Sequence, residues 1–241
     1  MIEIPKAKQA ATVILLRPGK SRAMEVLLTR RPDEMNFLGG MYCFPGGTVQ
    51  KEDFSSAMLR RCNGISPAAA RKIIGAQFSP KEALGLWVAA IRELFEEVGI
   101  LLATTADGTM ATMDRELSGS LVETHSSLLS QRLRFRALLE AENLQCDTTR
   151  LAYFSHWRTP SQFEVRFDTR FFLASLPAEH SPLTASPEVA DTLWLTPDCA
   201  LQRFAQGTLP MVFPTFASLR TLADFDSLES LFEEFRPAKS D

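Results

Sequence analysis

The chain has 241 residues, with 26 Lys or Arg against 29 Asp or Glu, so its formal net charge at pH 7 is −3. Mixed charges and 45% hydrophobic residues describe a soluble globular protein with material for a sizeable core. The sequence has no basic tract to indicate nucleic-acid binding and no apolar run long enough for a membrane span, and its four cysteines lack any C-x-x-C spacing. Scattered cysteines disfavour a zinc cluster or a disulfide framework and indicate reduced thiols in a cytoplasmic protein.

The chain is expected to begin with a β-hairpin. Alternating apolar residues predict strands over Ala10 to Arg17 and Met24 to Arg31, joined by a turn that contains Pro18 and Gly19. A loop with the sequence NFLGGMYCFPGG follows. From Asp53 to Phe78 the pattern is helical but is interrupted at NGISP, so two short helices are expected.

The next helix has clear start and stop signals. Ser79 is the expected N-cap, Pro80 lies in the first turn, and Glu82 stands three residues after the cap, as in a capping box. Gly99 is the expected C-terminal stop. Further helix is expected from Met113 to Asn143.

Strand patterns return in the second half of the chain. They cover Leu151 to Trp157, Arg166 to Leu176 and Thr192 to Thr196, and the segment that begins at Met211 is helical in pattern. Strands separated by helices predict a mixed α/β fold. We expect one domain that spans residues 1–241.

The helix that begins after Ser79 has two different faces. Glu93, Glu96 and Glu97 lie together on one face, where like charges are neighbours and oppose the helix dipole. The opposite face is apolar and contains Leu84, Trp87, Val88, Ile91, Leu94, Phe95 and Val98. Local folding rules disfavour the acidic face, and such violations are expected where function decides the residue.

A divalent cation would reverse the effect of this charge cluster. Carboxylate oxygens on a rigid helix face are ligands that Mg²⁺ and Mn²⁺ prefer. Arg92 lies beside the acidic face, four residues before Glu96, and can pair with a carboxylate that does not bind metal. On charge pattern alone, a solvated acidic surface is the more common interpretation. The glycine-rich loop upstream favours the metal site.

The C-terminal end of this helix resembles the second half of a known motif, the Nudix box. The Nudix box is G-x5-E-x7-R-E-U-x-E-E-x-G-U, where U is aliphatic. Its second half is matched at every fixed position by Arg92, Glu93, Leu94, Glu96, Glu97, Gly99 and Ile100. The first half starts at Gly47 in CFPGGTVQKED, with Asp53 where the family has Glu. A long insertion then separates Gly47 from Arg92.

A box with such an insertion resembles the coenzyme A diphosphatase type of the Nudix hydrolase family. The segments FPGG, KEDFSS, HWRTP, RFDTRFFLA and LWLTP are similar to that type, so the resemblance covers nearly the whole chain. The stretch LLTRRPDEMNFLGGMYCFPGG is similar to the coenzyme A signature, L-L-T-x-R followed by G-x3-F-P-G-G, but departs from it at Pro32 and Asn36. The resemblance implies a Nudix-like α/β/α sandwich with a mixed sheet. It also implies a helical insertion at about residues 54–84, a helical segment at about residues 113–145 and extra C-terminal helices.

The resemblance implies a metal-dependent hydrolase that cleaves the pyrophosphate of a nucleoside diphosphate linked to another moiety. The leading substrate is coenzyme A or acyl-coenzyme A, cut to 3',5'-ADP and (acyl)phosphopantetheine. The alternatives are another Nudix substrate (a nucleotide sugar, NADH or ADP-ribose) and a non-catalytic nucleotide-binding Nudix module. Neither a nucleic-acid nor a membrane partner is expected. Whether the insertion covers the active site or forms a homodimer contact stays open.

Residue roles follow from the same resemblance. The implied ligands of Mg²⁺ or Mn²⁺ are three carboxylates and one carbonyl, those of Glu93, Glu96, Glu97 and Gly47. Gly46 and Gly47 would let the backbone approach a substrate phosphate. Arg92 would orient the glutamates, with Asp53 and Gly99 as structural support of the box.

Two roles are less closely defined by the motif. The general base is open between Glu93, Glu97 and Glu188, the last lying in the segment SPEVADTLWL. Arg30 and Arg31 follow the second strand and are expected to bind substrate, because the guanidinium fork matches phosphate oxygens.

Overall fold

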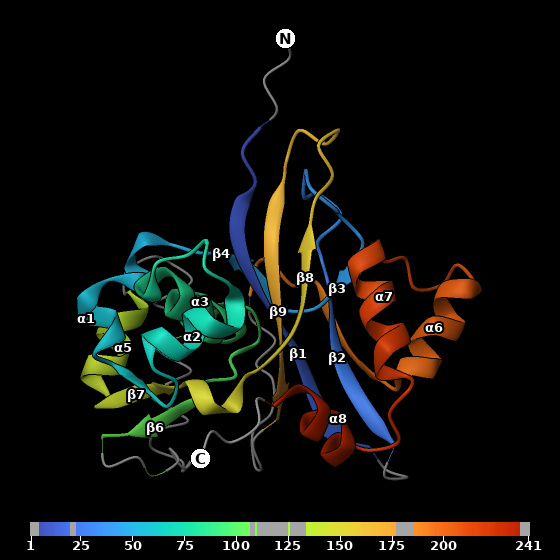
Figure 1. Ribbon diagram of the computed structural model, residues 1–241. Coiled ribbons are helices and arrows are strands. Elements are labelled where there is room, and N and C mark those ends of the chain that lie inside the picture. Colours follow the sequence, from blue (N-terminus) through green and yellow to red (C-terminus); the bar gives the residue numbers. More distant parts are fainter. Residues whose placement is uncertain are drawn as a thin grey trace.

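The computed structural model describes residues 5–19, 23–106, 109, 125, 134–176 and 186–236. Its centre is a mixed seven-stranded sheet (Figure 1). The five longer strands lie in the spatial order β10 (Asp191–Leu195), β2 (Met24–Arg30), β1 (Lys8–Pro18), β9 (Phe167–Ser175) and β8 (Ala152–Arg158). Two short strands complete the sheet: β3 (Tyr42–Cys43) pairs with β2, and β4 (Gly46–Thr48) pairs with β1.

Strand β1 is central because it pairs on both edges. It runs parallel to β9 from Lys8 to Leu16, which occupies one edge over nearly its whole length. On the other edge it pairs antiparallel first with β4, where Thr12 lies opposite Gly46, and then with β2. This arrangement places the Gly46–Gly47 pair beside the first half of β1.

Alternation along β1 supplies two hydrophobic cores, one on each face of the sheet. Ala11 and Val13 belong to the core under α3 (Pro80–Val98), whereas Ile14 and Leu16 belong to the opposite core. Figure 1 shows α3 on one side of the sheet with α2 (Pro67–Ile74) and α5 (Phe135–Ala141), and on the other side α6 (Pro197–Ala205), α7 (Phe213–Leu222) and α8 (Leu228–Phe235). This α/β/α sandwich confirms the predicted fold class.

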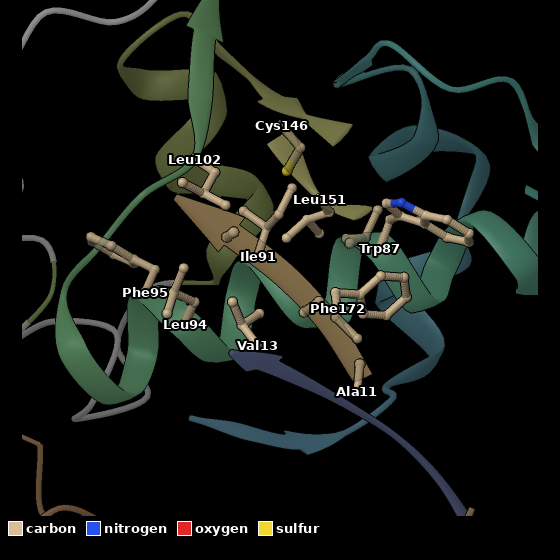
Figure 2. Packing of buried hydrophobic residues seen from close by; sticks show 14 of the residues in the cluster. Ala11, Val13, Trp87, Ile91, Leu94, Phe95, Leu102, Cys146, Leu151 and Phe172 are labelled. Carbon is tan, nitrogen blue, oxygen red and sulfur yellow. The ribbon is translucent and has the colours of Figure 1, made fainter. Parts of the chain in front are cut away.

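The core under α3 sets the orientation of that helix. Figure 2 shows Trp87, Ile91 and Leu94 of α3 packed around Val13 of β1 and Phe172 of β9. Each of these five side chains is at most 1% exposed. The ring centroids of Trp87 and Phe172 lie 4.8 Å apart. Because this apolar face must point into the core, the rotation of α3 about its axis is determined.

Helix α3 begins and ends at the residues expected from the sequence. The Ser79 hydroxyl accepts from the Glu82 N–H at 3.3 Å, and the Glu82 carboxylate accepts from the Ser79 N–H at 2.9 Å. At the other end, Gly99 has a φ of 70° and donates its N–H to the Phe95 carbonyl at 2.8 Å. Glycine adopts this left-handed conformation without steric cost.

Several short elements lie between β4 and α3. They are the 3₁₀ helix η1 (Lys51–Phe54), α1 (Ser56–Leu59), the two-residue strand β5 (Cys62–Asn63) and α2. Strand β5 forms a second sheet with β7 (Leu144–Asp147) and β6 (Ala103–Thr105), and the 3₁₀ helix η2 (Thr148–Arg150) follows β7. This sheet was not expected from the sequence, because strands of two to four residues are too short to show alternation.

Two further differences concern helices. Helix α6 was not among the elements expected from the sequence, although Thr196 caps it through a hydrogen bond from the Cys199 N–H at 3.2 Å. Most of the helix predicted from Met113 to Asn143 lies outside the described residues, and α5 is the helix described within that range. The division of the chain into one domain with an insertion stays a prediction.

Within the described ranges, no helix has both the length and the apolar character that a bilayer span requires. The four cysteines all carry free thiols.

Candidate active site

The acidic face of α3 lies against β4 instead of in open solvent. A Cβ added to Gly47 would lie 2.6 Å from the carboxylate atoms of Glu93, so the Glu93 carboxylate would have to move if this residue had a side chain. Glu97 Oε2 accepts a hydrogen bond from the Gly46 N–H at 3.3 Å. Glu93 and Glu97 are only 9% and 6% exposed. The interpretation of this face as a solvated acidic surface is therefore wrong for these two residues.

Arg92 is the buried centre of the site, with 3% exposure. Its Nε and Nη2 donate to the two oxygens of Asp53 at 2.8 and 3.0 Å. Its Nη1 donates to Glu93 Oε1 at 2.8 Å and to Glu96 Oε2 at 2.9 Å, and Nη2 also donates to the Thr48 carbonyl at 2.9 Å. Burial acts against the charged form, but the bonds to Asp53 and the charges of Glu93, Asp53 and Glu96 outweigh it and raise the pKa of Arg92. Arg92 therefore stays protonated and connects β4, η1 and α3.

The contact between Asp53 and Arg92 joins residues 39 positions apart. Asp53 is buried in η1, where its Oδ2 also accepts from the Gln50 N–H at 2.8 Å. The first turn after β4 therefore returns at once to α3. An aspartate reaches Arg92 here, at the position where the Nudix box has a longer glutamate.

Burial raises the pKa of all three glutamates on the acidic face. It raises the pKa of Glu93 to about 7, against the attraction of Arg92. It raises the pKa of Glu96 against the same attraction, and it raises that of Glu97 well above its ordinary value, with the charges of Glu93 and Glu188 adding to the increase. Without a cation, this cluster holds protons more tightly than exposed carboxylates do. A bound divalent ion would reverse that preference.

The oxygen donors of the site fit a hard divalent cation. Arg92 donates to one oxygen of Glu93 and to one oxygen of Glu96. The second oxygen of each carboxylate accepts no hydrogen bond from the described residues and can bind a cation. Glu97 bonds to the Gly46 N–H and Glu93 lies against Gly47, so both glutamates contact β4. Within the described part of the chain, no three His, Cys, Asp or Glu side chains already form a metal-binding group. Coordination by all three glutamates would therefore need their side chains to adjust.

Two loops bring further charges toward the cluster. Glu188 is exposed in the loop before β10, and its charge contributes to the raised pKa of both Glu96 and Glu97. Arg31 acts on Glu97 in the opposite direction, and its Nε donates to the Phe37 carbonyl at 3.2 Å. Glu188 and Arg31 therefore lie within electrostatic reach of the acidic face.

Arg30 differs from its neighbour Arg31. Its guanidinium pairs with Asp33 at 2.5 Å, and the other groups that affect its pKa are Tyr42 and Asp191. The bond to Asp33 is the main cause that raises the pKa of Arg30. The structure therefore directs Arg30 toward its own loop and toward β3 and β10.

Two contacts of the site had no signal in the sequence. The Thr48 carbonyl accepts from Arg92, and backbone acceptors cannot be recognised from residue type. His125 is buried, with its Nε2 3.0 Å from the Glu96 carbonyl and its ring edge-to-face with Phe95 at 5.3 Å. It satisfies a carbonyl in the last turn of α3, where intrahelical partners are lacking. A single histidine without ligand spacing gave no reason to expect this position.

Known proteins resemble the chain over most of its length. The family model described as the NUDT19 Nudix domain matches residues 7–222. Curated relatives named acyl-coenzyme A diphosphatase NUDT19 from Gallus gallus and Homo sapiens are 28% and 27% identical, over 93% and 89% of this chain. The matches cover 70% and 64% of those relatives. A solved Nudix hydrolase from Alicyclobacillus acidocaldarius is 30% identical, with a TM-score of 0.76 over 97% of this chain and 99% of that one.

Proposed function

Because the chain belongs to the Nudix hydrolase family and is a Nudix pyrophosphohydrolase, we propose that it cleaves coenzyme A or acyl-coenzyme A. The products would be 3',5'-ADP and (acyl)phosphopantetheine. The observation that carries the catalytic part of this proposal is the buried Arg92 network, which holds Glu93 and Glu96, with Glu93 against Gly47. The substrate is supported by the relatives, which are named acyl-coenzyme A diphosphatases.

We assign Glu93, Glu96, Glu97 and the Gly47 carbonyl as the ligands of Mg²⁺ or Mn²⁺. When bound, such an ion neutralises the pyrophosphate and favours attack by water in line with the leaving oxygen. The role of Arg92 is to position the glutamates, since each of its donors has an acceptor in the protein. It is therefore a positioning residue and does not contact the substrate.

The reaction needs a group that accepts the proton of the attacking water. We assign this role to Glu188 in preference to Glu93 and Glu97. Glu93 is held by Arg92 and Glu97 by the Gly46 N–H, whereas Glu188 is exposed and forms no ion pair with the described residues. The water oxygen would bond to one phosphorus, the bridging P–O bond would break, and Glu188 would take the water proton.

Of the two arginines, we assign Arg31 in preference to Arg30 to the binding of a substrate phosphate. Arg31 acts electrostatically on Glu97, so it lies on the side of the acidic face where phosphate would be cleaved. Arg30 would have to leave Asp33 before it could contact the same substrate. Replacement of Arg31 by Lys should therefore raise the KM for coenzyme A more than replacement of Arg30 by Lys.

Product identification tests the proposal directly. The protein, with Mg²⁺ or with a chelator, is incubated with coenzyme A, ADP-ribose, NADH and a nucleotide sugar, and the products are identified by mass spectrometry. We expect 3',5'-ADP and phosphopantetheine, formed fastest from coenzyme A and only with the metal. A higher kcat/KM for another substrate contradicts the coenzyme A assignment. Binding without turnover of any substrate contradicts the catalytic assignment and favours a nucleotide-binding module.

A further inference from the structure

A cavity of about 660 Å³ lies beside the N-terminal half of α3. Its lining includes Leu86 of α3 and Val49, which follows β4. Leu86 precedes Glu93 by seven residues, so the two lie on the same face of the helix, about 10 Å apart along its axis. Val49 follows Gly47 by two residues and continues the pairing with β1, since its N–H donates to the Gln9 carbonyl at 2.9 Å. The cavity borders the Arg92 network at Thr48, which lines the cavity and whose carbonyl accepts from Arg92 Nη2 at 2.9 Å.

The rim of this cavity is basic. Lys6, Lys8 and Lys51 line it and are exposed, and within the described residues none of them forms an ion pair. The acidic residue of the lining, Glu82, is already engaged by the Ser79 N–H at 2.9 Å in the capping box. Three ammonium groups without acidic partners at one cavity attract an anionic ligand, although the chain as a whole has a net charge of −3.

The wall of the cavity contains aromatic rings and is backed by a buried polar network. Phe54 and Phe78 line it, and the Arg170 guanidinium lies 5.3 Å from the centroid of the Phe78 ring. Arg170 is 2% exposed and pairs with Asp168, yet its Nε has no hydrogen-bond partner in the described part of the chain. The same holds for Oε1 of Gln9, which lines the cavity and donates to Asp168 through its Nε2 at 3.3 Å. Buried polar atoms without partners are rare, and a bound water or ion can satisfy them.

We propose that this cavity binds the 3'-phosphorylated nucleoside end of the substrate. Lys6, Lys8 and Lys51 would hold the 3'-phosphate, and Phe54 and Phe78 would contact the base. Charge decides between the two ends of the substrate, because the pantetheine arm beyond the pyrophosphate carries no negative charge and the nucleoside end carries a phosphate. The inference rests on the proposed function and adds to it the part of the site that selects a 3'-phosphate.

Kinetics with a matched pair of substrates test this assignment. Coenzyme A and 3'-dephospho-coenzyme A share the scissile pyrophosphate and differ in the phosphate assigned to the lysines. The double variant Lys8→Gln/Lys51→Gln should raise the KM for coenzyme A about five- to tenfold, with kcat unchanged and the KM for the dephosphorylated substrate unchanged. Lys72→Gln, an exposed lysine of α2 outside the cavity, is the control and should change neither value.

Binding of the product fragments separates this inference from the proposed function. In the presence of a chelator, calorimetry should show that the wild type binds 3',5'-ADP at least about fivefold more tightly than 5'-AMP, and that the double variant loses the difference. The preference for 3',5'-ADP without cleavage of coenzyme A would overturn the proposed function and leave the cavity assignment. Cleavage of coenzyme A with equal KM values for the two substrates, or with a double variant like the wild type, would overturn the cavity assignment alone. Equal melting temperatures of variant and wild type exclude misfolding as the cause.

Discussion

On one face of α3, Trp87 and Ile91 contact β1 and β9 and are almost fully buried; on the other face, Arg92, Glu93 and Glu97 are nearly as buried under β4. Burial of the first face stabilises the fold, at roughly 25 cal/mol per Å² of apolar surface removed from water. Burial of the second face carries a desolvation penalty that the ion pairs only partly offset. One helix can therefore carry a destabilising cluster of buried charges because burial of its opposite, apolar face holds it in place. Substitutions on the two faces should therefore have separable effects.

The largest expected effect is a loss of stability when Arg92, the cation of the charged face, is replaced. Arg92→Met would leave the buried carboxylates of Asp53 and Glu93 unpaired, so the free energy of unfolding should fall by about 3–5 kcal/mol. Urea unfolding followed by circular dichroism measures this change. Arg60→Met, at an exposed position in the insertion, is the matched control and should change the stability little. A loss for Arg92→Met no larger than for the control would mean that the network does not hold the site together.

Next in size is the loss of turnover when an acidic side chain is neutralised. Glu97→Gln should lower kcat for coenzyme A on the order of 10²–10³-fold, as expected when a preorganised charge is removed from an active site. Stability without metal should not fall, because burial already favours the neutral form of Glu97 by raising its pKa. Glu233→Gln on the exposed face of α8 is the control. A kcat close to that of the control would remove Glu97 from the proposed site.

Metal binding gives a third and smaller effect, again confined to the charged face. At a Mg²⁺ concentration of 100 times its Kd, the wild type should gain about 2.7 kcal/mol of stability. A thermal melt with and without a chelator detects this gain as a rise in melting temperature. The rise should be absent in Glu97→Gln and present in Glu233→Gln. A wild type whose melting temperature does not respond to Mg²⁺ or Mn²⁺ would argue against the assigned ligand set.

The smallest effect belongs to the apolar face. Ile91→Val removes one methylene from the core and should lower the free energy of unfolding by about 0.5–1.5 kcal/mol. The kcat and the stabilisation by Mg²⁺ should remain those of the wild type, because the rotation of α3 is kept by Trp87, Leu94 and Phe172. A change in metal response of this variant would show that the two faces are coupled more tightly than the comparison assumes.

Local signals in the sequence were enough to locate α3 and its two faces. The cap at Ser79, the stop at Gly99 and the apolar spacing between them depend on residues within about one or two helical turns of each other. The same holds for the match of Arg92 to Ile100 with the second half of the Nudix box. In very short elements such as β5 these local signals are absent, whereas α6 carries a local cap at Thr196 that was not used to predict it.

Contacts between distant parts of the chain could not be obtained in this way. The Gly46 N–H and Glu97 are 51 positions apart, and Asp53 reaches Arg92 only because η1 turns back toward α3. The approach of Glu188 and Arg31 to Glu97 likewise joins three separate elements. Each depends on the strand order of the sheet and on the insertion, not on a pattern along the chain.

By itself, then, the sequence determined that α3 is amphipathic, where it starts and ends, and which three carboxylates share a face. Only the tertiary structure decided that this face is covered by β4, that Arg92 is buried among four acceptors from three elements, and that a basic cavity borders this network at Thr48. The physical reason is the distance along the chain over which each interaction acts. Helix caps and helical periodicity act between neighbouring residues, whereas the environment of a charge is set by every element that folds against it.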